Sequence, residues 1–125
     1  MRLKAYVGQG KGYDSATRLW GEHLKDIFGY VPFQGTLNVA IRPTLDEAEL
    51  LAAYPVIEPF KDFICVAGEM QGVKVHFCYS RRRKTEEIGT FYVISELQLR
   101  DALGLTDKAQ VEIELTQPRT ERADG

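Results

Sequence analysis

Residues 63–79 read FICVAGEMQGVKVHFCY, and this stretch contains two short apolar runs separated by a turn. Both runs, residues 63–68 and 73–79, are rich in the β-branched and aromatic residues that favour strands. The four residues between them end in Gly72, which suits a tight turn. The stretch therefore predicts an antiparallel hairpin in the middle of the chain.

Further strands are predicted on both sides of this hairpin. In residues 36–41, Leu37, Val39 and Ile41 alternate with Thr36, Asn38 and Ala40, which is the period of a half-buried strand. Other β-rich runs are residues 3–7, 88–94 and 111–115. The chain is thus expected to contain at least five strands.

Two short helices are predicted among these strands. Residues 15–28 carry apolar side chains at helical spacing, and Gly29 follows the last of them. Ser95 and Gln98 have the spacing of a capping box, which predicts a helix over residues 97–103 that Gly104 ends. Residues 42–62 are less regular: they suggest a turn, with a short acidic helix through Ala53 as one alternative, and then an irregular segment containing Pro55 and Pro59.

This element count favours a mainly β fold, a small closed barrel with helical inserts. The chain has 125 residues, of which 44% are hydrophobic and 27% charged, the composition of one ordinary globular domain. The expected division is a barrel domain over residues 1–116 and a polar tail over residues 117–125.

Charge and hydropathy narrow the class of protein. The net charge of −2 argues against a strongly basic nucleic-acid binder. No apolar stretch approaches the roughly 18–20 residues that span a bilayer. Cys65 and Cys78 lie in apolar strand-like runs, where buried free thiols in a reducing compartment are expected. A cytoplasmic protein without a membrane partner is therefore predicted.

Two polar segments are candidates for chemistry. Gly8, Gly10 and Gly12 alternate in the loop after the first strand, which is either a plain turn or a backbone cradle for phosphate, with Lys11 as a point charge. The spacing matches neither a dinucleotide fingerprint nor a Walker loop. In the second segment, Thr36 and Asn38 would share one face of a strand, where their neutral oxygens suit Mg²⁺ or simply form a polar outer surface.

The remaining reactive residue types give weaker signals. Residues 81–84, Arg-Arg-Arg-Lys, form either a solvated loop or a site that attracts anions or nucleic acid. His23 and His76 lack the spacing of zinc ligands and are expected to be structural.

Three segments of the chain carry a family resemblance. They are Gly8–Gly12 (GQGKG), residues 28–39 (FGYVPFQGTLNV), and the pair formed by residues 99–105 (LRDALGL) and 111–114 (VEIE). Together and in this order they resemble the archaeal-type CTP-dependent riboflavin kinase family. The resemblance covers residues 3–115, and its central block is the most specific part.

The resemblance implies a six-stranded cradle-loop barrel, like that of riboflavin kinases, and a phosphotransferase reaction. The γ-phosphoryl group of CTP would pass to the 5′-hydroxyl of riboflavin, giving FMN and CDP, with Mg²⁺ as cofactor and the protein acting as a monomer. The implied nucleotide-binding residues are Gly8, Gln9, Gly10, Lys11, Gly12, Tyr13, Leu97, Gln98, Leu99 and Arg100. Thr36 and Asn38 would bind the metal and Thr85 the flavin, while no residue is assigned as the catalytic group.

The sequence departs from the family pattern at three places. Tyr92 stands where the family usually has a glutamate that contacts the flavin side, and the run after Thr85 is about one residue short. Asp107-Lys108-Ala109-Gln110 replaces the usual Asp-Gly-Asp turn. The Tyr92 departure keeps open a non-catalytic flavin- or nucleotide-binding protein. A cradle-loop DNA-binding protein is a further alternative, because residues 99–114 also fit swapped-hairpin transcription factors.

Overall fold

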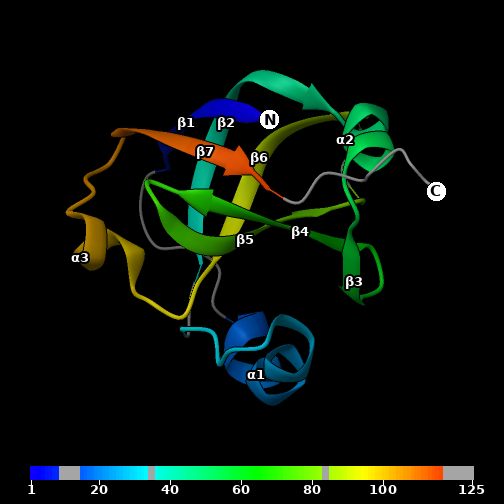
Figure 1. Ribbon diagram of the computed structural model, residues 1–125, viewed down its shortest axis with the longest axis vertical. Helices are drawn as coiled ribbons and strands as arrows, with labels where there is room; N and C mark the ends of the chain where they lie inside the picture. Colours follow the sequence, from blue (N-terminus) through cyan, green and yellow to red (C-terminus); the bar gives the residue numbers. More distant parts are fainter. Residues whose placement is uncertain (9–14, 34–35, 83–84, 117–125) are drawn as a thin grey trace.

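The chain forms a β-barrel with three helices outside it (Figure 1). The computed structural model describes residues 1–8, 15–33, 36–82 and 85–116. The elements along the chain are β1 (Arg2–Val7), α1 (Ser15–Phe28), β2 (Leu37–Asp46), α2 (Glu47–Ala53), β3 (Ile57–Phe60), β4 (Phe63–Met70), β5 (Val73–Ser80), β6 (Glu87–Ile94), α3 (Leu99–Leu103) and β7 (Gln110–Leu115).

Six strands close into a ring in the order β4-β5-β6-β2-β1-β7, and every pairing is antiparallel. The ring closes where β4 meets β7, with Gly68 opposite Leu115 and Met70 opposite Ile113. β3 lies outside this ring and pairs with β4 alone. The prediction of a mainly β, six-stranded barrel is confirmed.

The barrel interior is filled by the apolar side chains that alternate along the strands. Phe77 and Phe91 meet there with ring centroids 5.3 Å apart, and both are fully buried. Gly68 is required at the seam between β4 and β7, because a Cβ there would lie 2.5 Å from Phe77 Cε2 and closer still to the Glu114 carbonyl oxygen. The closure of the ring therefore depends on this glycine.

The segment between residues 42 and 62 is more regular than its sequence indicates. β2 does not end at Ile41: it continues through Pro43 to Asp46, with a shift of register between Ala40 and Leu45. β3 forms where an irregular segment is expected. Pro59 is compatible with it because β3 pairs along one edge only.

One helix confirms the alternative of a short acidic helix through Ala53, and the start of another differs from the prediction. α2 makes a third helix, which begins because the Asp46 side chain accepts a hydrogen bond from the Glu49 amide (3.2 Å). The capping box predicted at Ser95 is wrong. Gln98 is the N-cap of α3, since its side chain accepts from the Asp101 amide at 2.7 Å. The helix ends at Gly104 as predicted.

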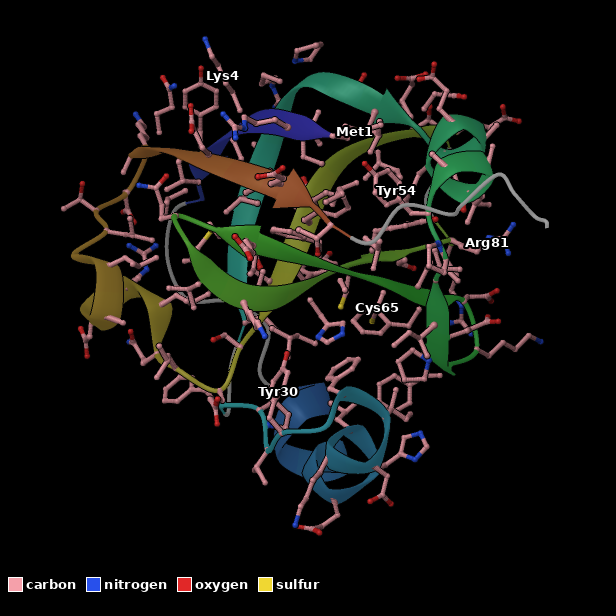
Figure 2. The ribbon with its side chains drawn as sticks, in the orientation of Figure 1. Met1, Lys4, Tyr30, Tyr54, Cys65 and Arg81 are labelled. Atoms are coloured by element: carbon pink, nitrogen blue, oxygen red, sulfur yellow. The ribbon has the colours of Figure 1, made fainter. Side chains whose placement is uncertain are left out.

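A second apolar cluster, which includes Tyr30 and Cys65, lies on the side of the barrel that faces α1 (Figure 2). We call it the outer cluster; it consists of Phe28, Tyr30, Phe63, Cys65, Cys78, Tyr92 and Ile94. Its two cysteines are free and fully buried, as predicted, and the Cys78 thiol donates a hydrogen bond to Cys65 Sγ at 2.7 Å. In the part of the chain that the structure describes, no helix is long and apolar enough to cross a membrane.

Candidate functional site

The chain leaves the first strand in close contact with the second. The Gly8 amide donates to the Asn38 carbonyl oxygen at 2.7 Å. A Cβ at Gly8 would lie 3.1 Å from that oxygen and 3.3 Å from Asn38 Cβ, so a larger residue would push the two segments apart. The predicted glycine-rich loop therefore starts directly against Asn38. Its other residues, 9–13, lie outside the described residues.

Thr36 and Asn38 lie together, as the strand periodicity predicts. Leu37 and Val39 are buried in the barrel, so Asn38 between them faces the outer side. The Thr36 hydroxyl donates to Asn38 Oδ1 at 3.5 Å. Two neutral oxygens thus stand beside the start of the glycine-rich loop.

These oxygens fit the metal that the family resemblance implies. Mg²⁺ prefers oxygen ligands and commonly completes its octahedron with substrate phosphates and water. The described ranges contain no group of three or more His, Cys, Asp or Glu residues able to hold a metal ion. A metal bound there would therefore rely on neutral protein oxygens and on its anionic ligand.

Arg100 connects the third helix to the same place. Its Nη2 donates to the Gly8 carbonyl oxygen at 2.8 Å and lies 2.8 Å from Asp107 Oδ1. Asp107 is the residue that sequence reasoning missed. A carboxylate seven positions after the arginine and just before the last strand is the signal that could have revealed it.

The predicted nucleotide segment 97–100 presents mixed chemistry. Leu97 is exposed, whereas Leu99 is buried in the barrel core. The Gln98 side-chain oxygen is engaged in capping α3. The contact of this segment with Gly8 is made by the Arg100 guanidinium.

Tyr92 lies directly opposite Asn38 in the β2–β6 ladder, and its other neighbour is Cys78 on β5. A row of residues therefore crosses the outer side of the barrel, from Gly8 through Asn38 and Tyr92 to the two cysteines. The position at which the resemblance leads us to expect a glutamate is therefore adjacent to the candidate metal ligands. In this chain the position is occupied by Tyr92, whose half-buried side chain is part of the outer cluster.

Behind this row, His76 and Tyr30 form a polar pair in apolar surroundings. Figure 2 shows Tyr30 and Cys65 on the side of the barrel that faces α1. The His76 ring stacks on Phe28 (centroids 4.1 Å apart), and its Nδ1 lies 2.9 Å from the Tyr30 hydroxyl, which donates to the Ile94 carbonyl at 3.2 Å. Burial lowers the pKa of His76 to about 4 and raises the pKa values of Tyr30 and Cys78.

Burial thus favours the neutral form of all three groups. The other histidine, His23, has its Nε2 3.0 Å from the Pro59 carbonyl oxygen and its ring against Phe60. Both histidines therefore have structural partners, as predicted.

Thr85 lies at the opposite end of the β2–β6 ladder. Its Oγ1 accepts a hydrogen bond from the Glu87 amide at 3.1 Å, and Glu87 pairs with Asp46. Tyr92 follows Thr85 by seven positions, which corresponds to a separation of up to about 23 Å at the rise of a strand. The structure thus groups Gly8, Thr36, Asn38 and Arg100, and it does not bring Thr85 together with them.

The basic run near Thr85 is partly neutralised. Arg81 Nε lies 3.1 Å from Glu47 Oε2, beside α2 (Figure 2), and Arg82 Nε lies 3.4 Å from Asp62 Oδ2. Residues 83 and 84 lie outside the described residues. Two of the four predicted positive charges are therefore engaged in ion pairs.

Comparison with known proteins gives two findings. The family model for CTP-dependent riboflavin kinases, described as a domain of unknown function (DUF120), matches residues 6–115. A riboflavin kinase of Methanocorpusculum labreanum is 31% identical over 120 residues, covering 84% of this chain and 51% of that protein. The chain thus spans about half the length of this relative.

Proposed function

The chain belongs to the CTP-dependent riboflavin kinase family, and on that premise we propose that it phosphorylates riboflavin to FMN with CTP as the donor. The observation that carries the proposal is the contact between Gly8 and Asn38. It puts the start of a glycine-rich loop 2.7 Å from a residue whose side chain, with Thr36, offers oxygens suited to Mg²⁺.

The reaction needs positioning more than covalent chemistry. The riboflavin 5′-hydroxyl oxygen forms a bond to the γ-phosphorus, the bond from that phosphorus to the β,γ-bridging oxygen breaks, and CDP leaves. The hydroxyl proton is released in the same reaction. Most of the rate acceleration then comes from holding the two substrates in line and neutralising charge.

The proposed roles follow the site geometry. Thr36 and Asn38 hold Mg²⁺, which when bound neutralises charge on the phosphates. Gly8, the loop residues 9–13 and the segment 97–100 hold the nucleotide. Thr85 contacts the flavin, which would then extend along the outer side of β6, away from Asn38.

Riboflavin, FMN, CTP and CDP are accordingly the proposed partners. We further propose that residues 1–116 act as one monomeric domain in the cytoplasm. The ion pairs of Arg81 and Arg82 reduce the charge available to a nucleic acid, which supports the kinase over a DNA-binding protein.

Tyr92 favours a second candidate, a protein that binds flavin or nucleotide without turnover. A tyrosine opposite Asn38 lacks the carboxylate that the family usually has on the flavin side of the site. Such a protein would quench riboflavin fluorescence on binding and form no FMN.

One assay separates the two candidates. The protein is incubated with riboflavin and CTP, ATP, GTP or UTP in turn, with Mg²⁺ or with EDTA, and the flavins are separated. The kinase predicts FMN with CTP and Mg²⁺, and none with EDTA. Absence of FMN with every donor would contradict the kinase proposal.

A further inference from the structure

Val7 and Gly8 are held from three directions. The Val7 amide donates to the Ala109 carbonyl oxygen, and the Val7 carbonyl accepts from the Lys108 amide, both at 2.8 Å. The Gly8 amide is bound to Asn38, and the Gly8 carbonyl accepts from Arg100 Nη2. The point where the chain leaves β1 is therefore fixed to β2, to α3 and to the turn before β7.

Arg100 is the only side chain among these four contacts, and its own position is well supported. It lies in α3, whose N-cap is Gln98 and whose Leu99 is buried in the barrel core. Its carbonyl also accepts from the Leu105 amide at 2.9 Å. The Arg100 side chain is 27% exposed, and its Nη2 lies 2.8 Å both from the Gly8 carbonyl oxygen, to which it donates, and from Asp107 Oδ1, with which it forms an ion pair.

We propose that Arg100 and Asp107 act as a positioning pair that fixes Gly8, and with it the start of the nucleotide loop, against Asn38. Arg100 then acts on the nucleotide through the Gly8 backbone rather than as a direct ligand. Asp107 orients the guanidinium and touches no substrate. The inference rests on the proposed function, because it assigns these residues to nucleotide binding at the same site.

The geometry predicts a selective effect of removing the pair. The Asp107 carboxylate, 2.8 Å from Nη2, forms an ion pair that holds the guanidinium in place. Without it, the Gly8 carbonyl loses a fixed donor while the backbone bonds of Val7 remain. We therefore expect weaker nucleotide binding, whereas the stability of the barrel and the binding of riboflavin should not change.

The test compares two surface ion pairs that differ in location. Asp107→Asn removes the charge beside Arg100, and Glu114→Gln removes it from the Arg2–Glu114 pair, whose atoms are 3.6 Å apart. The two carboxylate side chains are 46% and 45% exposed, so they are matched in burial. Asp107→Glu serves as the conservative variant that retains the charge.

Steady-state kinetics give the first readout. We expect Asp107→Asn to raise the KM for CTP about 3- to 10-fold, because the loss of the ion pair leaves the hydrogen bond from Arg100 to Gly8 less well oriented. The KM for riboflavin and the melting temperature should stay at wild-type values. Asp107→Glu should recover part of the CTP affinity, and Glu114→Gln should match the wild type. Equal rises of both KM values, or an unchanged KM for CTP, would overturn the inference.

Hydrogen exchange gives a second readout that needs no turnover. In the ligand-free protein, Asp107→Asn should speed amide exchange in the peptide containing Val7 and Gly8, and Glu114→Gln should not. If the wild type makes no FMN, the kinase proposal fails, yet this comparison still tests the pair. Unchanged exchange in Asp107→Asn would count against the pair whatever the enzyme assay gives.

Discussion

The two ends of the β2–β6 ladder have opposite chemistry. At one end Asn38 faces Tyr92, and the neighbouring contacts are made by neutral oxygens and backbone groups of Gly8 and Thr36. At the other end the carboxylates of Asp46 and Glu87 face each other, the neighbouring Glu47 is ion-paired with Arg81, and Thr85 adds a hydroxyl. Carboxylates repel phosphate and neutral donors do not. This contrast supports our proposal that the triphosphate binds at the Asn38 end and the uncharged flavin ring at the Thr85 end.

The largest effect is expected at the Asn38 end. Asn38→Ala removes one of the two proposed metal-binding oxygens, and we expect FMN formation to fall at least about 100-fold. Thr44→Ala is the matched control, because Thr44 is a polar residue of the same strand whose hydroxyl donates to Glu87 at the far end (2.7 Å). The control should keep the wild-type rate. An unchanged rate in Asn38→Ala would remove the metal assignment.

At the other end, the expected effect is on stability. Glu47 is 14% exposed in its side chain and accepts from the Tyr79 hydroxyl at 2.8 Å, as well as pairing with Arg81. Glu47→Gln should lower the free energy of unfolding by about 1–2 kcal/mol, a value reduced because Arg81 is half exposed. Denaturant titration measures this. Glu114→Gln, at a more exposed pair, should change it by under about 0.5 kcal/mol.

Thr85 tests whether the two ends bind different substrates. Thr85→Val keeps the branched shape and removes the hydroxyl, so we expect the KM for riboflavin to rise about 3- to 10-fold and that for CTP to stay unchanged. Steady-state kinetics with each substrate varied in turn supply the comparison. A rise in the KM for CTP instead would break the assignment of the two ends.

The smallest effect concerns the support behind the Asn38 end. His76 has a native pKa of about 4 against about 6.5 when unfolded, so between these values only the unfolded chain takes up the proton. The contribution of His76 to the free energy of unfolding is therefore fully present above pH 6.5 and is lost as the pH falls to 4. After discounting for partial exposure, it amounts to about 1 kcal/mol. Between pH 7 and pH 4.5, the free energy of unfolding should fall less in His76→Gln than in the wild type. In His23→Gln it should fall as much as in the wild type.

Most strands of the barrel could be predicted because their side chains alternate between interior and exterior. The strand bounds predicted for residues 63–79 and 88–94 lie within two residues of those found. The strand predictions were wrong where pairing with a neighbouring strand outweighed a local sequence signal. Pro43 and Pro59 indicate breaks in the chain, yet neighbouring strands hold both segments extended.

The candidate site could be predicted only in part. The strand period places Thr36 and Asn38 on one side, since that depends on two adjacent positions alone. The partners of Asn38, namely Gly8 and Tyr92, depend on the register between strands distant in the sequence. No local pattern encodes that register. The Arg100–Asp107 pair is different, because its two residues are only seven positions apart in the sequence.

The closure of the barrel has a consequence for how the chain folds. Arg2 pairs with Glu114, 112 positions away in the sequence, and Met70 pairs with Ile113. Such distant pairings carry a large loop-closure entropy and form slowly, while the β4–β5 hairpin needs only a two-residue turn. On the ribosome, we expect this hairpin to form early, whereas the ring cannot close until β7 has been synthesised and released.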